Sequence, residues 1–319
     1  MANLAPLMTP DTPSPAPASP SATSPVPAVP ADDLGRPDFW RSFAPGLHIG
    51  DVSFMSRYSA FAISPAQQES VAARVRREGY LQANVDWGLD LGLMANTVRA
   101  LSAADLPPVF AFLYDEFWIP FYRLHLFLSG LLGGKYFMMP DFWVWNVDPR
   151  KGERGFPPHR DRFYMPLLPD GSTMSVNAWI PLSSATPLNS CMYVVPAMLD
   201  PTYGTENHGE LKFDHASIRA LPAEPGDFFI WNSELLHWGS QSSERGGESR
   251  VSIAFEFQRA DVRPVNEKPL IEPLSVLPFD LRLKIICRQL VGYLHNYTAA
   301  PHVERFARDV IESPTKDPW

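Results

Sequence analysis

The chain has 319 residues, 45% of them hydrophobic, and a formal net charge of -8 at pH 7. This length and composition can bury a large core. The acidic balance, without clustered Lys and Arg, argues against nucleic acid or an anionic membrane surface as the main partner. The two cysteines, Cys191 and Cys287, stand in apolar surroundings, so we expect no disulfide framework and a reducing, cytoplasmic location.

The first 36 residues are rich in Pro, Ala and Ser and contain few large apolar side chains. Such a segment cannot offset the entropy cost of ordering, and we predict a disordered tail at 1–36. It has neither the charged start and apolar centre of a secretory signal nor, before Arg36, the arginines of a transit peptide. We predict one folded domain at 37–262 and a C-terminal helical extension at 263–319.

Helices are predicted in the first half of the domain. Ser64-Pro65 is a start signal for a helix over Ala66 to Glu78, and a second capped run covers Ser102 to Phe117. The most apolar stretch, 109–134, is interrupted by charged residues and a proline, which excludes a membrane span. We expect a buried helical pair there and no membrane insertion.

Short segments rich in β-branched and aromatic residues follow from Phe142 onward, bounded by Pro, Gly, Asp and Ser. We predict strands at Phe142–Val147, Arg162–Leu167, Met174–Leu182, Met192–Val195, Asp227–Trp231, Ser233–Gly239 and Ser249–Phe257. Many short strands after a helical half indicate an α+β protein whose core is a jelly roll with the preceding helices on its outer face.

An amphipathic helix is predicted near the C-terminus, at 278–297. Its apolar residues recur at helical spacing, namely Leu281, Ile285, Ile286, Leu290 and Leu294. This apolar face must be covered. Packing on the chain's own barrel is one interpretation, and a homodimer through 278–297 is the other.

Two histidines and one aspartate form the strongest functional pattern. If residues 159–161 are extended, His159 and Asp161 point to the same side while Arg160 points away. His-x-Asp alone is weak, because most such histidines are solvated or core residues. His237 lies in an otherwise apolar strand and needs a polar partner. Two imidazoles and one carboxylate on one face of a metal leave positions open, which is typical of ferrous oxygenase sites.

An arginine follows in the last predicted strand. In Ser249–Phe257, alternation places Arg250, Ser252 and Glu256 on one face and the large apolar residues on the other. The apolar face can pack on helices, which directs Arg250 and Ser252 inward. An inward guanidinium needs an anion, and it suits a carboxylate in two-point contact. An internal salt bridge to Glu256 or Asp227 is the alternative.

Substrate features are less specific. Seven aromatic residues crowd these motifs, and about one in three is expected to line a pocket, the others being core: Trp143, Trp145, Phe163, Tyr164, Trp179, Trp231 and Trp238. Arg160 and Arg162 either receive an acidic substrate or are solvated. His208 and His215 lie in a polar loop and are interpreted as part of a lid or as solvent-facing residues.

The motifs together resemble the phytanoyl-CoA dioxygenase (PhyH-like) family of Fe(II)/2-oxoglutarate oxygenases. The resemblance covers about Asp51 to Gln258 and uses the ordered set His-x-Asp, distal His and Arg. It also includes the segments Arg77–Tyr80, Asn177–Leu182 and Val195–Pro196. These motifs are short, and the set is more specific than any one of them.

The resemblance implies a double-stranded β-helix, a relative of the jelly roll and the cupins. It implies iron ligation by His159, Asp161 and His237 and binding of the distal carboxylate of 2-oxoglutarate by Arg250. Ser252 fits an Arg-x-Ser pattern. Trp238 separates the distal histidine from Gly239-Ser240, so the resemblance assigns no role to Ser240.

The implied reaction uses Fe(II), 2-oxoglutarate and dioxygen to hydroxylate a C–H bond of a small organic substrate, releasing succinate and CO2. Related halogenases replace the aspartate with Ala or Gly, so an intact Asp161 predicts oxygen transfer. A cupin-like metal-binding protein or a zinc-dependent hydrolase with the same three ligands are the alternatives. Neither accounts for an inward Arg250 and Ser252.

Overall fold

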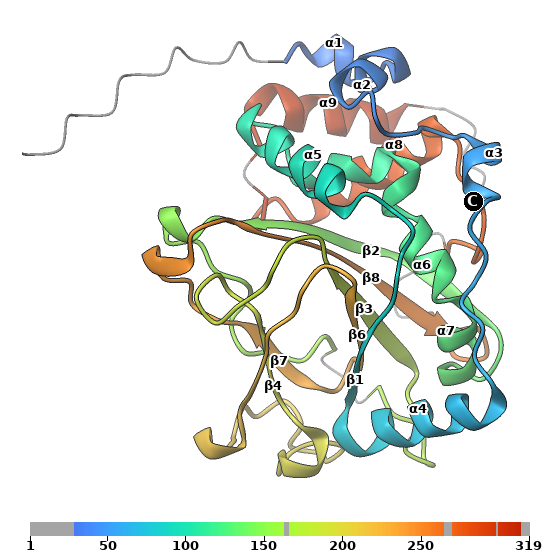
Figure 1. Cartoon of the computed structure of the whole chain (residues 1–319), viewed down its shortest axis with the longest axis vertical. Coiled ribbons are helices and arrows are strands. Elements are labelled where there is room, and N and C mark those ends of the chain that lie inside the picture. Colours follow the sequence, from blue (N-terminus) through green and yellow to red (C-terminus); the bar gives the residue numbers. More distant parts are fainter. Residues whose placement is uncertain (1–28, 163–165, 265–269, 298, 314–319) are drawn as a thin grey trace, which may run out of the picture.

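Two antiparallel β-sheets face each other, and helices cover the outer side of the larger one (Figure 1). The structure is a computed structural model, and it describes residues 29–162, 166–264, 270–297 and 299–313. The larger sheet has the order β1 (Tyr80–Asn84), β6 (Asp227–Asn232), β3 (Ser175–Pro181), β8 (Arg250–Arg259) and β2 (Tyr136–Val147). The smaller has the order β5 (Arg219–Leu221), β4 (Met192–Val195) and β7 (Leu236–Gly239). This confirms the predicted α+β jelly roll of the double-stranded β-helix class.

Alternation along β8 separates two cores, as predicted. Val251, Ile253 and Phe255 belong to the large apolar cluster under the helices. Ala254 belongs to a second cluster between the sheets, with Trp179 and two aromatic residues of β6, Phe229 and Trp231. The second cluster surrounds the space in which the polar side chains of β8 lie.

Seven helices precede β2 in the described residues: α1 (Ala31–Leu34), α2 (Pro37–Phe43), α3 (Val52–Met55), α4 (Pro65–Glu78), α5 (Leu91–Ala103), α6 (Ile119–Arg123) and α7 (His125–Leu131). The α4 prediction is confirmed. Ser64 and Gln67 form a reciprocal capping box, and Gly79 ends the helix at φ 84°, where glycine is unstrained.

The helix predicted at Ser102–Phe117 is wrong. α5 already ends at Ala103, and short 3-10 turns, η1 (Pro108–Leu113) and η2 (Asp115–Phe117), follow the two prolines at 107 and 108. The expected helical pair at 109–134 is instead a series of short helical pieces. Asp115, one of the charged residues that interrupt this apolar stretch, forms a buried ion pair with Arg282, with 2.6 Å between Oδ1 and Nη1.

Two strand predictions also need correction. The segment Arg162–Leu167 forms no strand in its described part, and Leu167 makes only an isolated bridge to Thr173. Phe163 and Tyr164 lie outside the described residues. Residues 159–161 are joined to the smaller sheet by one bridge, from His159 to His237, and not by a strand. A loop beside a sheet edge therefore carries the metal motif.

Helices α8 (Phe279–Gly292) and α9 (Pro301–Glu312) make up the described C-terminal extension. The apolar residues Ile285, Ile286 and Leu290 of α8 are at most 1% exposed, and Gln289 Nε2 donates to the Phe142 carbonyl of β2 at 2.7 Å. The predicted amphipathic helix is thus covered by its own chain, and no homodimer through 278–297 is needed to cover it.

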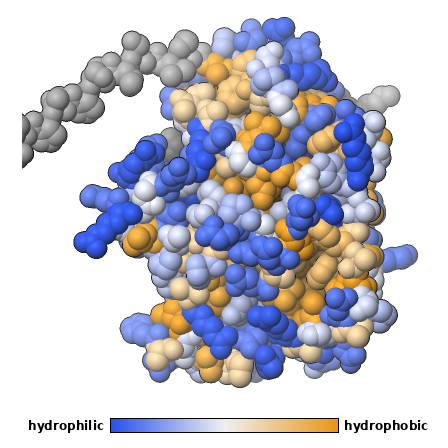
Figure 2. Space-filling view, viewed as in Figure 1, coloured by the Kyte–Doolittle hydropathy of each residue, from blue (hydrophilic) through white to orange (hydrophobic). Residues whose placement is uncertain are grey.

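The predicted tail at 1–36 lies outside the described residues as far as position 28. Its last part is folded, because Leu34 of α1 is fully buried and α1 contacts α9. Ordered structure therefore begins before the predicted boundary. On the face seen in Figure 2, hydrophilic and hydrophobic residues are interspersed. Among the described helices, none has both the length and the apolar character needed to cross a membrane.

Candidate metal centre

His159, Asp161 and His237 meet at one point between the two sheets. Their ligand atoms lie within 4.8 Å of one another. The two histidines face each other across a reciprocal backbone bridge, with both N···O distances at 3.0 Å. Asp161 Oδ1 is 3.5 Å from Nε2 of each histidine. The structure therefore brings together all three residues predicted as metal ligands.

Hydrogen bonds orient each of these side chains. His159 Nδ1 donates to the Pro157 carbonyl at 2.8 Å, and His237 Nδ1 donates to the Leu235 carbonyl at 2.9 Å. Because each Nδ1 carries the proton, each Nε2 keeps a lone pair directed at the common point. Contacts of this kind fix the tautomer and ring orientation of metal-binding histidines.

Asp161 is held from its other oxygen. Asn177 Nδ2 and Trp231 Nε1 both donate to Asp161 Oδ2, at 2.8 and 2.9 Å. This leaves Oδ1 turned toward the histidines. The sequence prediction placed Trp231 among aromatic residues that either line a pocket or belong to the core, and it gave Asn177 no role. The available signal was a single amide in the otherwise apolar run of β3.

Electrostatics favour the protonation states that coordinate a divalent ion. Burial lowers the pKa of His237 to about 4, so its imidazole is neutral near pH 7. Burial by itself raises the pKa of Asp161, but the charges of His237 and His159 and the bond from Trp231 hold it below its usual range. Burial by itself lowers the pKa of His159, but the neighbouring Asp161 carboxylate outweighs this effect and raises the pKa above its usual value. Metal binding requires neutral His159, so a bound cation would compete with the proton that Asp161 favours on this imidazole.

Close packing of two backbone segments allows the backbone bridge between His159 and His237. A Cβ added at Gly239 would lie 2.6 Å from Gly155 Cα, and one added at Gly155 would lie 2.8 Å from Gly239 Cα. Gly239 N also donates to the Phe156 carbonyl at 3.0 Å. Two glycines therefore allow the segment before His159 to approach the strand that carries His237.

Arg250 lies in the space between the sheets, as predicted, and is 3% exposed. Its Nη1 donates to Ser252 Oγ at 2.6 Å, and its guanidinium lies 5.7 Å from the Trp179 ring centroid. Burial lowers the pKa of Arg250 to about 10, which leaves it charged near pH 7.

No carboxylate pairs with Arg250 among the described residues. The alternative partners are engaged elsewhere: Glu256 pairs with Arg162, and Asp227 accepts from Asn84 Nδ2 at 3.0 Å. Arg250 Nε has no hydrogen-bond partner in that part of the chain. A buried cation without a counter-ion is costly, and the cost is removed when an anion binds.

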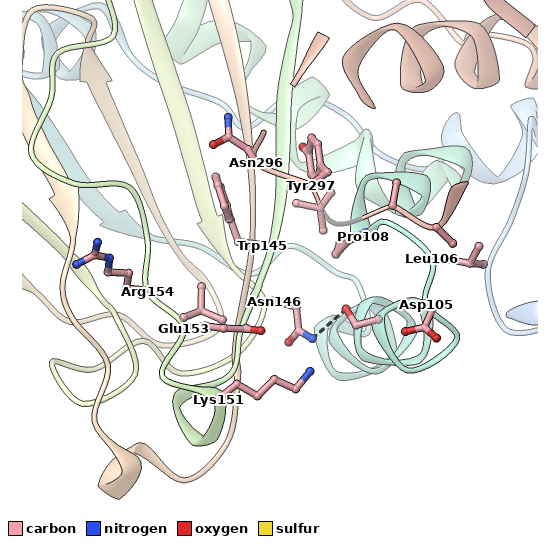
Figure 3. Close-up of a pocket in the computed structure, with 15 residues that line it drawn as sticks. Asp105, Leu106, Pro108, Trp145, Asn146, Lys151, Glu153, Arg154, Asn296 and Tyr297 are labelled. Atoms are coloured by element: carbon pink, nitrogen blue, oxygen red, sulfur yellow. Dashed lines mark hydrogen bonds between the residues drawn. The ribbon is translucent and has the colours of Figure 1, made fainter. Parts of the chain in front are cut away.

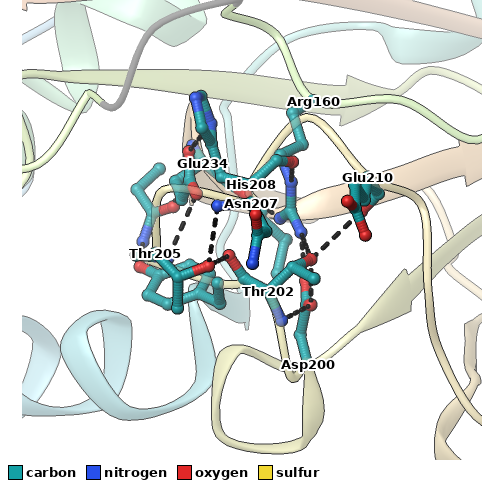
Figure 4. A network of polar contacts seen from close by, with 12 residues as sticks. Arg160, Asp200, Thr202, Thr205, Asn207, His208, Glu210 and Glu234 are labelled. Carbon is teal, nitrogen blue, oxygen red and sulfur yellow. Dashed lines mark hydrogen bonds and ion pairs between the residues drawn. The ribbon is translucent and has the colours of Figure 1, made fainter.

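Arg160 and Arg162 are neither solvated nor open to an acidic substrate. The Arg160 side chain is 3% exposed, and its Nη2 lies 2.7 Å from Asp200 Oδ2 (Figure 4). It also donates to the carbonyls of His208 and Glu234, at 2.6 and 2.5 Å. Arg160 therefore ties the metal loop to the loop at 200–210 and to the turn before β7.

The structure also shows where three other residues singled out in the sequence lie, namely His208, His215 and Trp238. His208 is largely buried, with Nδ1 3.2 Å from Glu234 Oε2, whereas His215 is exposed on a short 3-10 turn. Trp238 stacks with Tyr193 and Phe213, with ring centroids 5.9 and 5.6 Å away, and it belongs to neither of the two apolar cores. Neither His208 nor His215 belongs to the metal cluster.

Comparisons with known proteins agree with this site. Residues 108–247 match the model of the family described as phytanoyl-CoA dioxygenase (PhyH). No curated protein matches the chain.

Three solved structures illustrate the similarity. The non-heme alpha ketoglutarate dependent epimerase SnoN from nogalamycin biosynthesis is 22% identical, covering 66% of this chain and 96% of its own, with a TM-score of 0.48. AviO1 from Streptomyces viridochromogenes Tue57 is 16% identical, covering 64% and 100%, with a TM-score of 0.47. EctD from S. alaskensis is 16% identical, covering 69% and 92%, with a TM-score of 0.45.

The family match at 108–247 includes His159, Asp161 and His237, and it confirms the resemblance seen in the sequence. Over residues 108–247 the chain is therefore similar to the phytanoyl-CoA dioxygenase (PhyH) family.

Proposed function

We propose that the chain hydroxylates an unactivated C–H bond of a small organic substrate. His159, Asp161 and His237 hold Fe(II), and Arg250 with Ser252 binds the distal carboxylate of 2-oxoglutarate. When bound, iron and 2-oxoglutarate would supply the oxidising chemistry with dioxygen as the oxidant, one oxygen atom going to the substrate and the other to succinate as CO2 leaves 2-oxoglutarate. The observation that carries the proposal is the buried Arg250 guanidinium, which pairs with no carboxylate in the described part of the chain and lies between the same two sheets as the two-histidine, one-carboxylate cluster.

The chain's own residues position the metal and its anionic ligand and exclude water from the site. Neutral His237 and anionic Asp161 leave one net positive charge on a divalent ion, which favours a chelating anion. Arg250 and Ser252 give the far end of that anion a charge-assisted bond and a hydroxyl donor. The aromatic residues between the sheets exclude water from the reacting atoms.

The carboxylate at 161 supports oxygen transfer in particular. Because Asp161 occupies one coordination position, no halide can take that place. Both cysteines are free and buried, which supports the proposed cytoplasmic location. A zinc hydrolase would need a free carboxylate base near the metal, whereas Glu256 is paired with Arg162.

Anaerobic titration of the full chain with Fe(II) and 2-oxoglutarate tests the assignment. We expect a weak visible charge-transfer band, followed by succinate release when air is admitted. His237→Ala should abolish the band. Arg250→Ala should weaken 2-oxoglutarate binding by about 2–5 kcal/mol, because it removes one partner of a buried charge-assisted contact. Arg76→Ala, an exposed position on α4, is the matched control.

The absence of a band in the wild type would overturn the proposed chemistry. An unchanged 2-oxoglutarate affinity in Arg250→Ala would show that the buried guanidinium has only a structural role. The substrate itself is sought by substrate-dependent oxygen uptake, because 2-oxoglutarate turnover alone does not identify it.

A further inference from the structure

A cavity of about 570 Å³ lies beside β2, and Figure 3 shows the residues that line it; none of the three predicted metal ligands is among them. Its walls come from four parts of the chain: the end of α5 with the following turn, β2 at 144–147, the turn at 151–154, and the C-terminal residues Asn296, Tyr297, Ala299 and Ala300. β2 is an edge strand of the larger sheet. The volume falls within the range of about 300–1,000 Å³ that is usual for small-molecule sites.

Aromatic rings connect this cavity to the metal centre. Trp145 lines the cavity, and its ring centroid lies 5.1 Å from that of Phe156. The Phe156 ring lies 5.4 Å from the His159 ring. Only one aromatic side chain therefore separates the wall of the cavity from a predicted iron ligand.

The C-terminal extension supplies the opposite wall. Tyr297 lines the cavity and stacks on Trp143 with centroids 5.8 Å apart at 21°. Trp143 in turn stacks on Trp145 at 5.4 Å and 12°. Tyr293 meets the same Trp143 ring at 4.7 Å and donates to Asp141 Oδ1 at 2.9 Å. These tyrosines lie outside the residues that match the family model, 108–247.

The lining indicates the chemistry of a ligand. Trp145 and Tyr297 offer aromatic surface, and Leu106, Pro108 and Val144 add aliphatic surface. Four ionisable side chains also line the cavity, two acidic and two basic, so their formal charges cancel: Asp105, Glu153, Lys151 and Arg154. Aromatic walls favour rings, and a balanced set of charges selects no ion.

We propose that this cavity is the outer chamber of the substrate site and that it receives the uncharged, ring-shaped body of the substrate. The substrate carries hydroxyl or other polar groups that meet Ser102, Asn296 and the charged rim. The assignment rests on the proposed function only in naming the ligand as substrate. Binding of such a compound next to the metal can be measured without turnover.

The probe is 2-naphthol, a neutral two-ring alcohol, added to the full chain loaded with Mn(II). Calorimetry gives its affinity, and broadening of its proton resonances by Mn(II) reports that it binds near the metal. Ala300→Trp, which fills the cavity from the C-terminal side, should weaken binding at least about tenfold and remove the broadening. Ala73→Trp, on the exposed face of α4, should change neither.

Further variants separate the cavity from the metal site. His237→Ala should remove the broadening while leaving the calorimetric affinity unchanged, because the ion is lost and the cavity is kept. Tyr297→Leu should weaken 2-naphthol about tenfold while retaining Mn(II), as read by electron paramagnetic resonance. Thermal unfolding establishes that each variant is folded.

Three results would overturn the proposal: no 2-naphthol binding to the wild type, binding without broadening in a chain that electron paramagnetic resonance shows to hold Mn(II), or unchanged binding in a folded Ala300→Trp chain. Failure of the Fe(II) and 2-oxoglutarate assignment would instead appear as a missing charge-transfer band with 2-naphthol binding intact. The two hypotheses therefore fail separately.

Discussion

Breaking the ion pair between Arg160 and Asp200 should destabilise the chain strongly. Both side chains are almost fully buried, and Arg160 donates to four acceptors on two other segments, the loop at 200–210 and the turn before β7. Arg160→Met leaves Asp200 without its cation, and losing one partner of a buried pair typically costs about 3–5 kcal/mol. Asp200 keeps its bonds from the Thr202 backbone and hydroxyl, both at 3.0 Å, which places the expected loss at the lower end of that range.

The measurement is a double-mutant cycle in urea with the metal-free chain. Asp200→Asn should cost less than Arg160→Met, because the amide oxygen still accepts from Thr202. The double variant should lose less than the sum of the two single variants, with a coupling energy of about 1–3 kcal/mol. Additive losses, or a loss below about 1 kcal/mol for Arg160→Met, would refute the claim that this pair joins the metal loop to its neighbours.

Three other perturbations have defined outcomes. Burial depresses the pKa of His237 from 6.5 to about 4, so the unfolded chain binds a proton in this window that the folded metal-free chain does not. Its contribution to stability is complete above pH 6.5 and is lost as pH falls toward about 4, by up to about 3 kcal/mol. Urea unfolding should show a smaller pH slope for His237→Gln than for the wild type, and equal slopes would contradict the assigned burial. Asn177→Ala should weaken Fe(II) binding about 10–100-fold in an anaerobic titration, because the bond that turns Asp161 toward the histidines is lost; Asn84→Ala, at an exposed strand position, should not. Gly239→Ala should reduce both the free energy of unfolding and Fe(II) affinity, since its Cβ would meet Gly155 Cα at 2.6 Å; an unperturbed affinity would show that the approach of the two segments is not required.

Local pattern predicted much of the metal centre and less of its surroundings. The spacing of His159 and Asp161, and the isolated polar position of His237 in an apolar strand, were enough to bring the three together in a prediction. Strand alternation placed Arg250 and Ser252 inward, and the structure agrees. The metal ligands and the inward direction of Arg250 and Ser252 could be predicted because they depend on residues close in sequence or on the two-residue alternation of side chains along a strand.

The roles that sequence reasoning missed depend on contacts between distant segments. Arg160 was expected to face a substrate or solvent because its partners, among them Asp200, come from loops whose path no local pattern reveals. Trp231 was expected to line a pocket or to belong to the core, whereas its ring nitrogen donates a hydrogen bond to Asp161. The helix expected at 102–117 failed because tertiary burial and two successive prolines outweigh helix-forming composition.

The backbone bridge between His159 and His237 also limits how the centre can adapt to different ions. The separation of the two imidazoles is set by paired peptide groups, which cannot lengthen without breaking the bridge. Asp161 Oδ1 is instead placed by rotation of a short side chain whose second oxygen is held by an amide and an indole. The Asp161 side chain must therefore move to accommodate an ion of different radius. Substitutions of Asn177 or Trp231, which hold that side chain, are expected to change the preference of the site among divalent metals.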